Sequence, residues 1–370
     1  MRGINPKYLD KLDEAQRAFI LTATGKKFWD EFVCKHGDHI FIIGTTGSGK
    51  TNRGYWLVNW LMHTETIIWI SCGKNKEILP LLCLGKPVRI ICPKGCSVEI
   101  TERGPDRKWH TIADHPEVVT VSEAGSAWWA VKKGAINIFE FRNCFWMKSE
   151  AASWMGELFS TLATWTRLSM MPAIFPFTLF GDESQWFIAG TRVTTDQARV
   201  KTSETVTENA LEIRSAGGRL ALFAQDYTNI TPASRENLIN AILCRGAHVD
   251  RSENAALATH CNMKRGRIPA NYHSDEGKFV HSDGTAYPVT APWKFPLFPK
   301  SKQDREWIEK LRIKYEGFFD QQSAEMEIET ECMPDLGRYA ALAIPPDHLE
   351  EVQNIVTRYD AQIGMVEDET

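Results

Sequence analysis

The eight residues from Gly44 to Thr51 read Gly-Thr-Thr-Gly-Ser-Gly-Lys-Thr and constrain the fold of this chain more than any other stretch. They fit the phosphate-loop pattern G-x-x-x-x-G-K-[ST]. An apolar run, Ile40 to Ile43, precedes them, and Asn52 to Met62 follow with large apolar residues at helical spacing. Because a loop between a buried strand and a helix N-terminus gathers N–H donors and the positive end of the helix dipole, the pattern predicts an anion site rather than an ordinary glycine-rich turn.

The residue types in this loop suit a nucleoside triphosphate. We expect Lys50 to reach the β- and γ-phosphates of ATP and the Thr51 hydroxyl to bind Mg²⁺. The predicted nucleotide-binding residues are the whole loop, namely Gly44, Thr45, Thr46, Gly47, Ser48, Gly49, Lys50 and Thr51.

A second motif follows the apolar run Ala173 to Phe180, which ends in Gly181, Asp182 and Glu183. An acidic pair at the end of a buried strand is typical of a Walker B element, although an ordinary strand end has the same form. We expect Asp182 to hold Mg²⁺ and Glu183 to polarise the attacking water. Ligand sites of parallel sheets lie at the carboxyl ends of their strands, which is where both motifs fall.

Further apolar segments predict an α/β fold with a mainly parallel central sheet flanked by helices. Gln225 ends one of the expected strands, where it could sense the γ-phosphate. Residues 101–133 are expected to be irregular. The expected strands are 66–71, 88–92, 135–141 and 219–225, and the expected helices are 5–34, 149–168, 303–318 and 346–359.

Composition limits the class of protein. No apolar run approaches the roughly 20 residues that span a bilayer, and the polar N-terminus predicts no signal peptide and a cytoplasmic location. The nine cysteines are scattered, so we expect reduced thiols. The net charge is −4, but acidic residues concentrate beyond Asp320 and the remainder is net basic, so a nucleic-acid partner stays open.

Several stretches resemble the FtsK–HerA superfamily of DNA-pumping ATPases. They are residues 39–51, 214–225 with its continuation to Asn237, and 277–284. The chain departs from the superfamily at Gly181, where an aliphatic residue is usual, and at Asp226-Tyr227, where Arg-Pro is frequent. The resemblance implies a RecA-like (ASCE) P-loop NTPase motor over residues 37–300, an N-terminal helical extension over 1–36, and a C-terminal helical segment with an acidic tail over 301–370.

The resemblance also assigns roles to residues. It implies Lys50, Glu183 and Gln225 as catalytic groups, the last as γ-phosphate sensor, and Thr51 and Asp182 as metal ligands. Arg214 matches an arginine that reaches the nucleotide of a neighbouring subunit, with a surface arginine at a helix end as the equal alternative. Other arginines that could take this role are Arg235, Arg245 and Arg251.

Basic residues after the acidic pair could contact DNA phosphates in the pore of a ring. Arg192, Arg199 and Lys201 lie among small hydroxyl residues, and a solvated loop is the equal alternative. Weaker candidates are Lys132, Lys133 and the basic cluster of residues 103–108.

The sequence therefore predicts an ATP-driven translocase of double-stranded DNA. It would act as a homo-oligomeric ring, a hexamer by resemblance, in genome packaging or DNA transfer, using ATP and Mg²⁺. Its location would be the cytoplasm, or the host cytoplasm for a viral protein, with docking to a portal, capsid or membrane partner left open. The alternatives are a secretion or virion-assembly ATPase with a protein substrate, and a nucleotide-dependent switch.

Overall fold

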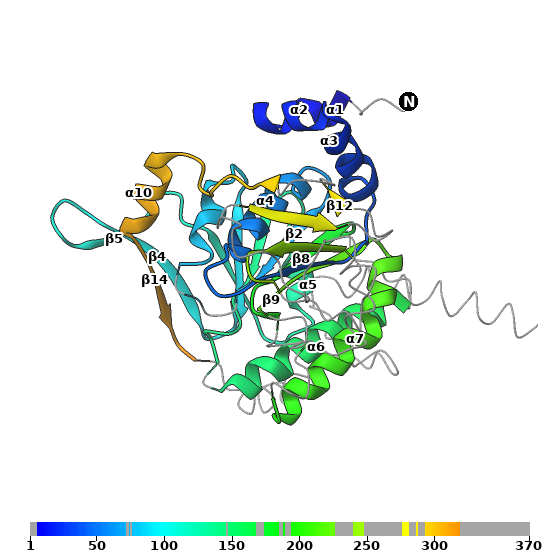
Figure 1. Ribbon diagram of the computed structural model, residues 1–370. Coiled ribbons are helices and arrows are strands. Elements are labelled where there is room, and N and C mark those ends of the chain that lie inside the picture. Colours follow the sequence, from blue (N-terminus) through cyan, green and yellow to red (C-terminus); the bar gives the residue numbers. More distant parts are fainter. Residues whose placement is uncertain are drawn as a thin grey trace, which may run out of the picture.

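The computed structural model describes residues 6–71, 74, 76–145, 147–167, 174–184, 188, 194–225, 240–247, 276–280, 286–287 and 293–318. Within these residues an eleven-stranded sheet forms the centre of the molecule (Figure 1). Its strands are β1 (Ile40–Ile43), β2 (Thr66–Ile70), β3 (Val88–Pro93), β6 (Glu117–Val121), β7 (Ile136–Phe139), β8 (Phe177–Gly181), β9 (Gly218–Ala224), β10 (Asn240–Cys244), β11 (Glu276–Val280), β12 (Ala286–Tyr287) and β13 (Trp293–Lys294).

The strand order is β12-β11-β10-β1-β9-β8-β2-β7-β3-β6, with β13 also paired to β11. Every pairing from β10 to β6 is parallel, and only β11 and its partners are antiparallel. The carboxyl ends of β1, β9, β8 and β2 therefore lie together at one edge of the sheet. The predicted α/β fold with a mainly parallel central sheet is confirmed.

Helices cover both faces of this sheet. Helix α4 (Lys50–Leu61) connects β1 to β2, whereas α6 (Lys148–Arg167) and α7 (Gln197–Ser215) lead into β8 and β9 and move along the sheet in the opposite direction. Because parallel crossovers are right-handed, opposite directions place the helices on opposite faces. Figure 1 shows α4 on one side, with α6 and α7 packed together on the other.

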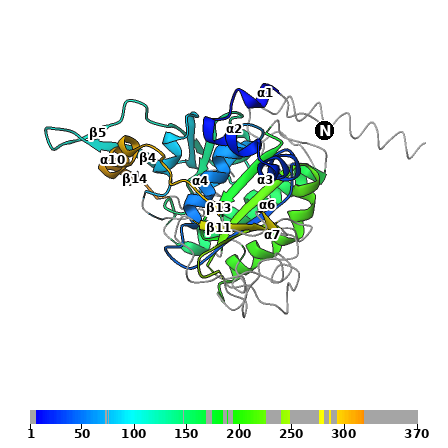
Figure 2. The ribbon, with the colours of Figure 1, turned by 45° about the horizontal axis from the view of Figure 1, so that its top comes forward.

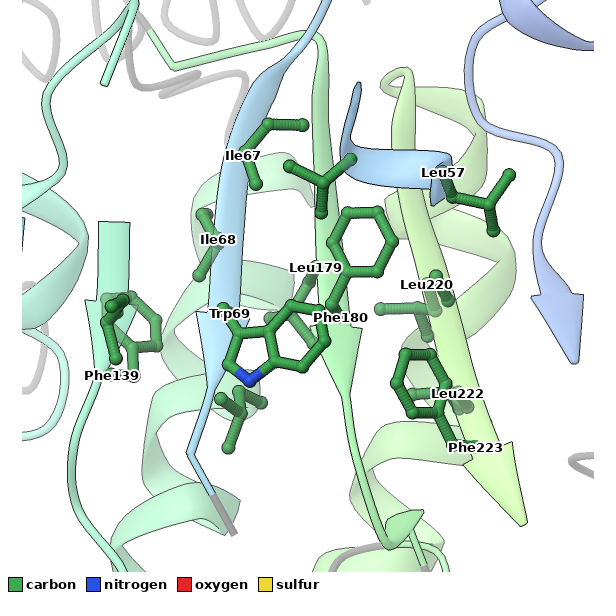
Figure 3. Close-up of a cluster of buried hydrophobic side chains, with 14 of the residues drawn as sticks. Leu57, Ile67, Ile68, Trp69, Phe139, Leu179, Phe180, Leu220, Leu222 and Phe223 are labelled. Carbon is green, nitrogen blue, oxygen red and sulfur yellow. The ribbon is translucent and has the colours of Figure 1, made fainter. Parts of the chain in front are cut away.

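An aromatic row fills the core beneath α4. Trp69 stacks on Phe180 from the next strand with ring centroids 5.6 Å apart, and Phe223 meets Trp69 edge to face (Figure 3). Gly54 in α4 makes this close packing possible, since a Cβ there would lie 2.4 Å from the Phe223 ring. The helix that begins in the phosphate loop is therefore fixed directly against the sheet.

In place of the single helix expected over residues 5–34, the N-terminal extension forms several short helical pieces. These are α1 (Pro6–Leu9), α2 (Glu14–Ile20), α3 (Ala23–Phe28) and a π-helical segment, Trp29–Val33. Arg219 of β9 joins the extension to the sheet. Its fully buried guanidinium donates to the Phe32 and Lys35 carbonyls at 2.9 Å each and lies 3.0 Å from the buried Glu65 carboxylate.

A second, three-stranded sheet stands beside the first, and we call it the side sheet. It consists of β4 (Ser97–Arg103), β5 (Trp109–Thr111) and β14 (Leu311–Glu316) in the order β14-β4-β5. The hairpin that joins β4 to β5 projects away from the central sheet in both views (Figures 1 and 2).

The side sheet corrects two sequence-based expectations. Residues 101–133 are not irregular throughout, because they contain β5, β6, α5 (Ala127–Ala130) and the end of β4. The expected helix 303–318 stops early: α10 covers Lys302–Lys310 and β14 follows. Alternation of buried or half-buried Leu311, Ile313 and Tyr315 with exposed charged residues has the period of a strand, and β4 supplies its partner.

The far C-terminal part of the chain was expected to hold a helix over 346–359 and an acidic tail. Both lie outside the described residues and stay predictions. Of the helices that the structure describes, none has the length and apolarity needed to cross a bilayer.

Replacing Glu65 with alanine is expected to lower the free energy of unfolding by about 3–5 kcal/mol, because Arg219 would stay buried without the carboxylate that it contacts directly. Urea unfolding followed by tryptophan fluorescence measures this change. The matched control is Glu31→Ala in the exposed Lys27–Glu31 pair, expected to cost less than about 1 kcal/mol. Equal effects at the two sites would contradict a structural role for the buried pair.

Candidate nucleotide site

The phosphate loop forms the turn between β1 and α4, as the sequence predicts. Gly47 and Gly49 adopt positive φ angles of 73° and 80°, which glycine accepts without strain. The N–H groups of Gly44 and Thr45 donate to Ala224 and Arg245 at the ends of β9 and β10, at 3.2 and 3.4 Å. The two neighbouring strands therefore hold the loop in shape.

Lys50 bends back across this loop. Its Nζ donates to the carbonyl oxygens of Gly44 at 2.7 Å and Thr45 at 3.0 Å, and the residue is only 8% exposed. Burial lowers the pKa of Lys50, an effect that nearby anionic groups including Asp182 partly oppose. Helix α4 has no acidic residue in its first turn and no side-chain cap, so no carboxylate of the helix's own first turn offsets its N-terminal dipole.

Asp182 lies at the end of β8 and is completely buried. Its Oδ2 accepts a hydrogen bond of 2.9 Å from the Thr51 hydroxyl, and its Oδ1 accepts one of 3.0 Å from the Glu183 N–H. The two predicted metal ligands, 131 positions apart in the chain, are thus in direct contact.

Glu183 has a φ of 51°, in the left-handed region that residues other than glycine rarely adopt. Such a conformation costs on the order of 1 kcal/mol or more, and it is frequent at functional sites. The Glu183 side chain is a quarter exposed, so it combines a fixed backbone with access to solvent.

Lys74 is the residue of this site that the sequence analysis missed. Its Nζ lies 3.1 Å from Asp182 Oδ2 and 3.2 Å from Glu183 Oε1, bridging both carboxylates. Burial disfavours its charge, but the two carboxylates outweigh that effect and raise the pKa of Lys74. Only the pairing of β2 with β8 brings it here, and nothing local in the sequence indicates that pairing.

These contacts test whether the residues fit a divalent cation. The Thr51 hydroxyl and the Asp182 carboxylate are hard oxygen ligands, as Mg²⁺ prefers. The Lys74 ammonium already lies beside the Asp182 carboxylate as a cation. Among the described residues there is no cluster of three or more His, Cys, Asp or Glu side chains placed to hold a metal ion. The site therefore suits Mg²⁺ that takes its remaining ligands from phosphate and water.

Gln225 lies between the two motifs. It follows β9, which pairs with β1 on one side and β8 on the other, and it is exposed. In the register Ala224 stands beside Ile43, so Gln225 is level with the first residue of the phosphate loop. Ser184 adds a cross-link, donating its hydroxyl to the Phe223 carbonyl at 2.7 Å.

Glu140 is a further carboxyl at the same edge of the sheet, at the end of β7. It accepts hydrogen bonds from Asn143 at 2.8 Å and from the Tyr315 hydroxyl of β14 at 3.3 Å. Burial raises the pKa of Glu140 to about 7. It connects the side sheet to the edge that carries Asp182.

Arg214 is not at this site within its own chain. It lies in the last turn of α7, just before β9 begins, and donates to the buried Asp38 carboxylate at 2.8 Å. That is the opposite edge of the sheet from the phosphate loop. Of the other candidate arginines, Arg245 lies beside the loop, since its carbonyl accepts from the Thr45 N–H and hydroxyl, whereas Arg235 and Arg251 lie outside the described residues.

The segment expected to contact DNA is only partly described. Arg192 lies outside the described residues, whereas Arg199 and Lys201 belong to the first turns of α7. Arg199 donates to the Thr194 hydroxyl at 3.3 Å, and burial lowers its pKa. Lys201 is exposed. From Gln197 onward the segment is therefore helix rather than loop.

A phosphate loop after β1, an acidic pair after β8 and an intervening strand β9 define the RecA-like P-loop NTPase fold. No protein-family model matches the chain, and no curated protein matches its sequence.

Three solved structures illustrate what the chain is similar to, each with a weak superposition. EccC (ATPases 2 and 3) of Thermomonospora curvata, in complex with a signal sequence peptide, has 12% identity over 71% of this chain and 37% of its own, with a TM-score of 0.35. EssC (ATPases 2 and 3) of Geobacillus thermodenitrificans has 14% identity over 80% of this chain and 46% of its own, with a TM-score of 0.37. The genome packaging NTPase B204 of Sulfolobus turreted icosahedral virus 2, in complex with AMP, has 11% identity over 67% of this chain and 95% of its own, with a TM-score of 0.35.

This chain thus matches about a third to a half of the two bacterial ATPase chains but nearly the full viral one. The motifs and the strand order of this chain are what define its RecA-like P-loop NTPase fold.

Replacing Lys74 with methionine is expected to lower, several-fold, the Mg²⁺ concentration needed for half-maximal binding of a fluorescent, non-hydrolysable ATP analogue. The physical reason is that the Lys74 ammonium and Mg²⁺ compete for Asp182 Oδ2. Lys76→Met is the matched control, because Lys76 donates to the Glu309 carbonyl instead. An unchanged Mg²⁺ requirement in Lys74→Met would contradict this competition.

Proposed function

We propose that this protein is a Mg²⁺-dependent ATPase that moves double-stranded DNA as a ring of identical subunits. One observation carries the enzymatic part of the proposal: the hydrogen bond of 2.9 Å between Thr51 and Asp182. It unites the phosphate loop and the acidic pair in a single site, as phosphoryl transfer to water requires.

In this proposal each group has a defined task. The loop N–H groups and Lys50 bind the phosphates, and Glu183 aligns the attacking water. Thr51 and Asp182 would hold Mg²⁺, which when bound neutralises charge on the β- and γ-phosphate oxygens. Gln225, level with the loop and next to β8, would sense whether the γ-phosphate is present.

The ring and the DNA substrate rest on the sequence resemblance to the FtsK–HerA superfamily. Arg214 suits a role towards a neighbouring subunit because it lies at the opposite edge of the sheet from the nucleotide site of its own chain. Genome packaging or DNA transfer in the cytoplasm is the setting we favour. A motor that acts on a protein substrate is the alternative.

Lys50→Ala is expected to abolish ATP turnover and nucleotide binding, because the buried ammonium inside the loop is lost. Glu183→Gln is expected to bind ATP with near parental affinity but to lower kcat by about 10²–10⁴-fold, since the amide cannot accept a proton from water. Steady-state phosphate release and equilibrium nucleotide binding separate the two effects. Normal hydrolysis by Glu183→Gln would refute its assignment as the base.

Double-stranded DNA is expected to raise the ATPase rate several-fold, and the stimulation should weaken steeply as salt increases, because phosphate contacts release counterions. The measurement is phosphate release with and without duplex DNA across a salt series. The Lys50→Ala variant controls for contaminating activity. Robust turnover that duplex DNA leaves unchanged at every salt concentration would favour the protein-substrate alternative.

A further inference from the structure

The outer face of the side sheet gathers cations around an exposed tryptophan. Trp109 of β5 is 45% exposed, and the Arg312 guanidinium of β14 lies 5.8 Å from its ring centroid. Arg103 is the register partner of Trp109 across the hairpin. Two segments about 200 positions apart in the sequence thus build one surface. Figure 2 shows the hairpin between β4 and β5 projecting from the body of the molecule.

Three carboxylates of this projection already have partners. Asp106 accepts from the His110 ring and the Lys108 N–H, and Glu99 accepts from the Thr111 hydroxyl. Glu316 pairs with Lys314. By contrast, no carboxylate of the described residues lies within ion-pair distance of the following cations: Arg103, Arg107, Lys108 and Arg312.

The tip of the hairpin carries one of these cations at a strained position. Arg107 has a φ of 63° in the turn that the Gly104 N–H closes by donating to the Lys108 carbonyl at 2.8 Å. Glycine would adopt this conformation freely, whereas arginine costs on the order of 1 kcal/mol. A charged side chain therefore stands at the tip against the local backbone preference.

A cavity of about 430 Å³ opens at the base of the same hairpin. Its lining includes the basic side chains of Arg103, His110 and Lys310, together with the carboxylate of Glu102. Partial enclosure reduces the screening of charges by salt, so an anionic group would be held more firmly here than on an open surface.

We propose that the hairpin and β14 form a nucleic-acid contact surface, separate from the nucleotide site, that binds the phosphodiester backbone. The four cations that have no carboxylate partner among the described residues would contact phosphates, and Trp109 would pack on a sugar or base. A polyanion that also carries flat rings matches this combination better than an acidic peptide, which offers charge alone. The inference rests on the proposed function for its choice of duplex DNA, but the binding itself needs no ATP.

The decisive variant is Arg107→Gly combined with Lys108→Gln, assayed as the full chain for binding of a labelled duplex without nucleotide or Mg²⁺. Affinity is expected to fall on the order of tenfold, and the slope of log K against log salt to become shallower by about 2. Glycine relieves the strain at position 107, so the thermal unfolding midpoint should not fall. The matched control is Lys11→Gln with Lys27→Gln, in the turn between α1 and α2 and in α3, which also removes two cations.

Parental affinity and salt slope in the hairpin variant would overturn the inference, as would an equal loss in the control. A second variant, Trp109→Ala with Arg312→Gln, should weaken duplex binding as well, and single-stranded DNA tests whether bases add to the backbone contact. Polyglutamate that binds the hairpin as tightly as DNA of equal charge would overturn it in favour of an acidic protein partner.

ATP turnover in the absence of DNA separates the two proposals. The hairpin variant should keep the parental rate, because none of its altered residues lies at the nucleotide site. If the parental protein failed to hydrolyse ATP but bound duplex through the hairpin, the proposed function would fail and this inference would stand.

Discussion

The contact between Thr51 and Asp182 is the interaction on which the functional architecture depends. It joins the first helical residues after β1 to the end of β8, across the intervening strand β9. Strand β9 acts as the spacer: its carbonyl at Ala224 braces the loop, and its carbonyl at Phe223 accepts from Ser184. The separation of the two motifs is thereby fixed by the roughly 4.8 Å spacing of neighbouring strands rather than by flexible side chains.

Two ammonium groups, those of Lys74 and Lys50, lie near this contact and already have partners in the protein. Burying a carboxylate costs several kcal/mol unless a cation compensates its charge. For Asp182 the Lys74 ammonium is that cation. The Lys50 ammonium instead donates hydrogen bonds to two carbonyl oxygens of the phosphate loop. In the proposed function both ammonium groups would change partners when a magnesium nucleotide binds, which would couple binding to local rearrangement.

The side sheet is not an isolated appendage. Strand β14 pairs with β4 along its length, and its Tyr315 hydroxyl reaches Glu140 at the carboxyl edge of the central sheet. Residues 296–298, which precede α10 and β14, are hydrogen-bonded to α4, since Asn52 donates to the Pro296 carbonyl and accepts from the Phe298 N–H. A continuous set of contacts therefore links the projecting hairpin with the nucleotide site, through residues that lie far apart in the sequence.

The sequence by itself determined the local chemistry. The loop from Gly44 to Thr51, the apolar strands and the acidic pair are encoded by neighbouring residues, whose spacing directly reflects backbone geometry. Only the tertiary structure decided the strand order, and with it the arrival of Lys74 at Asp182 and of Arg312 beside Trp109, and the position of Arg214 at the opposite edge. Such pairings join residues dozens to hundreds of positions apart, and although the period of a segment can indicate a strand, it does not indicate which strand is the partner. The helix expected over 303–318 ends at Lys310, because the residues from Leu311 onward alternate with the period of a strand and pair with β4.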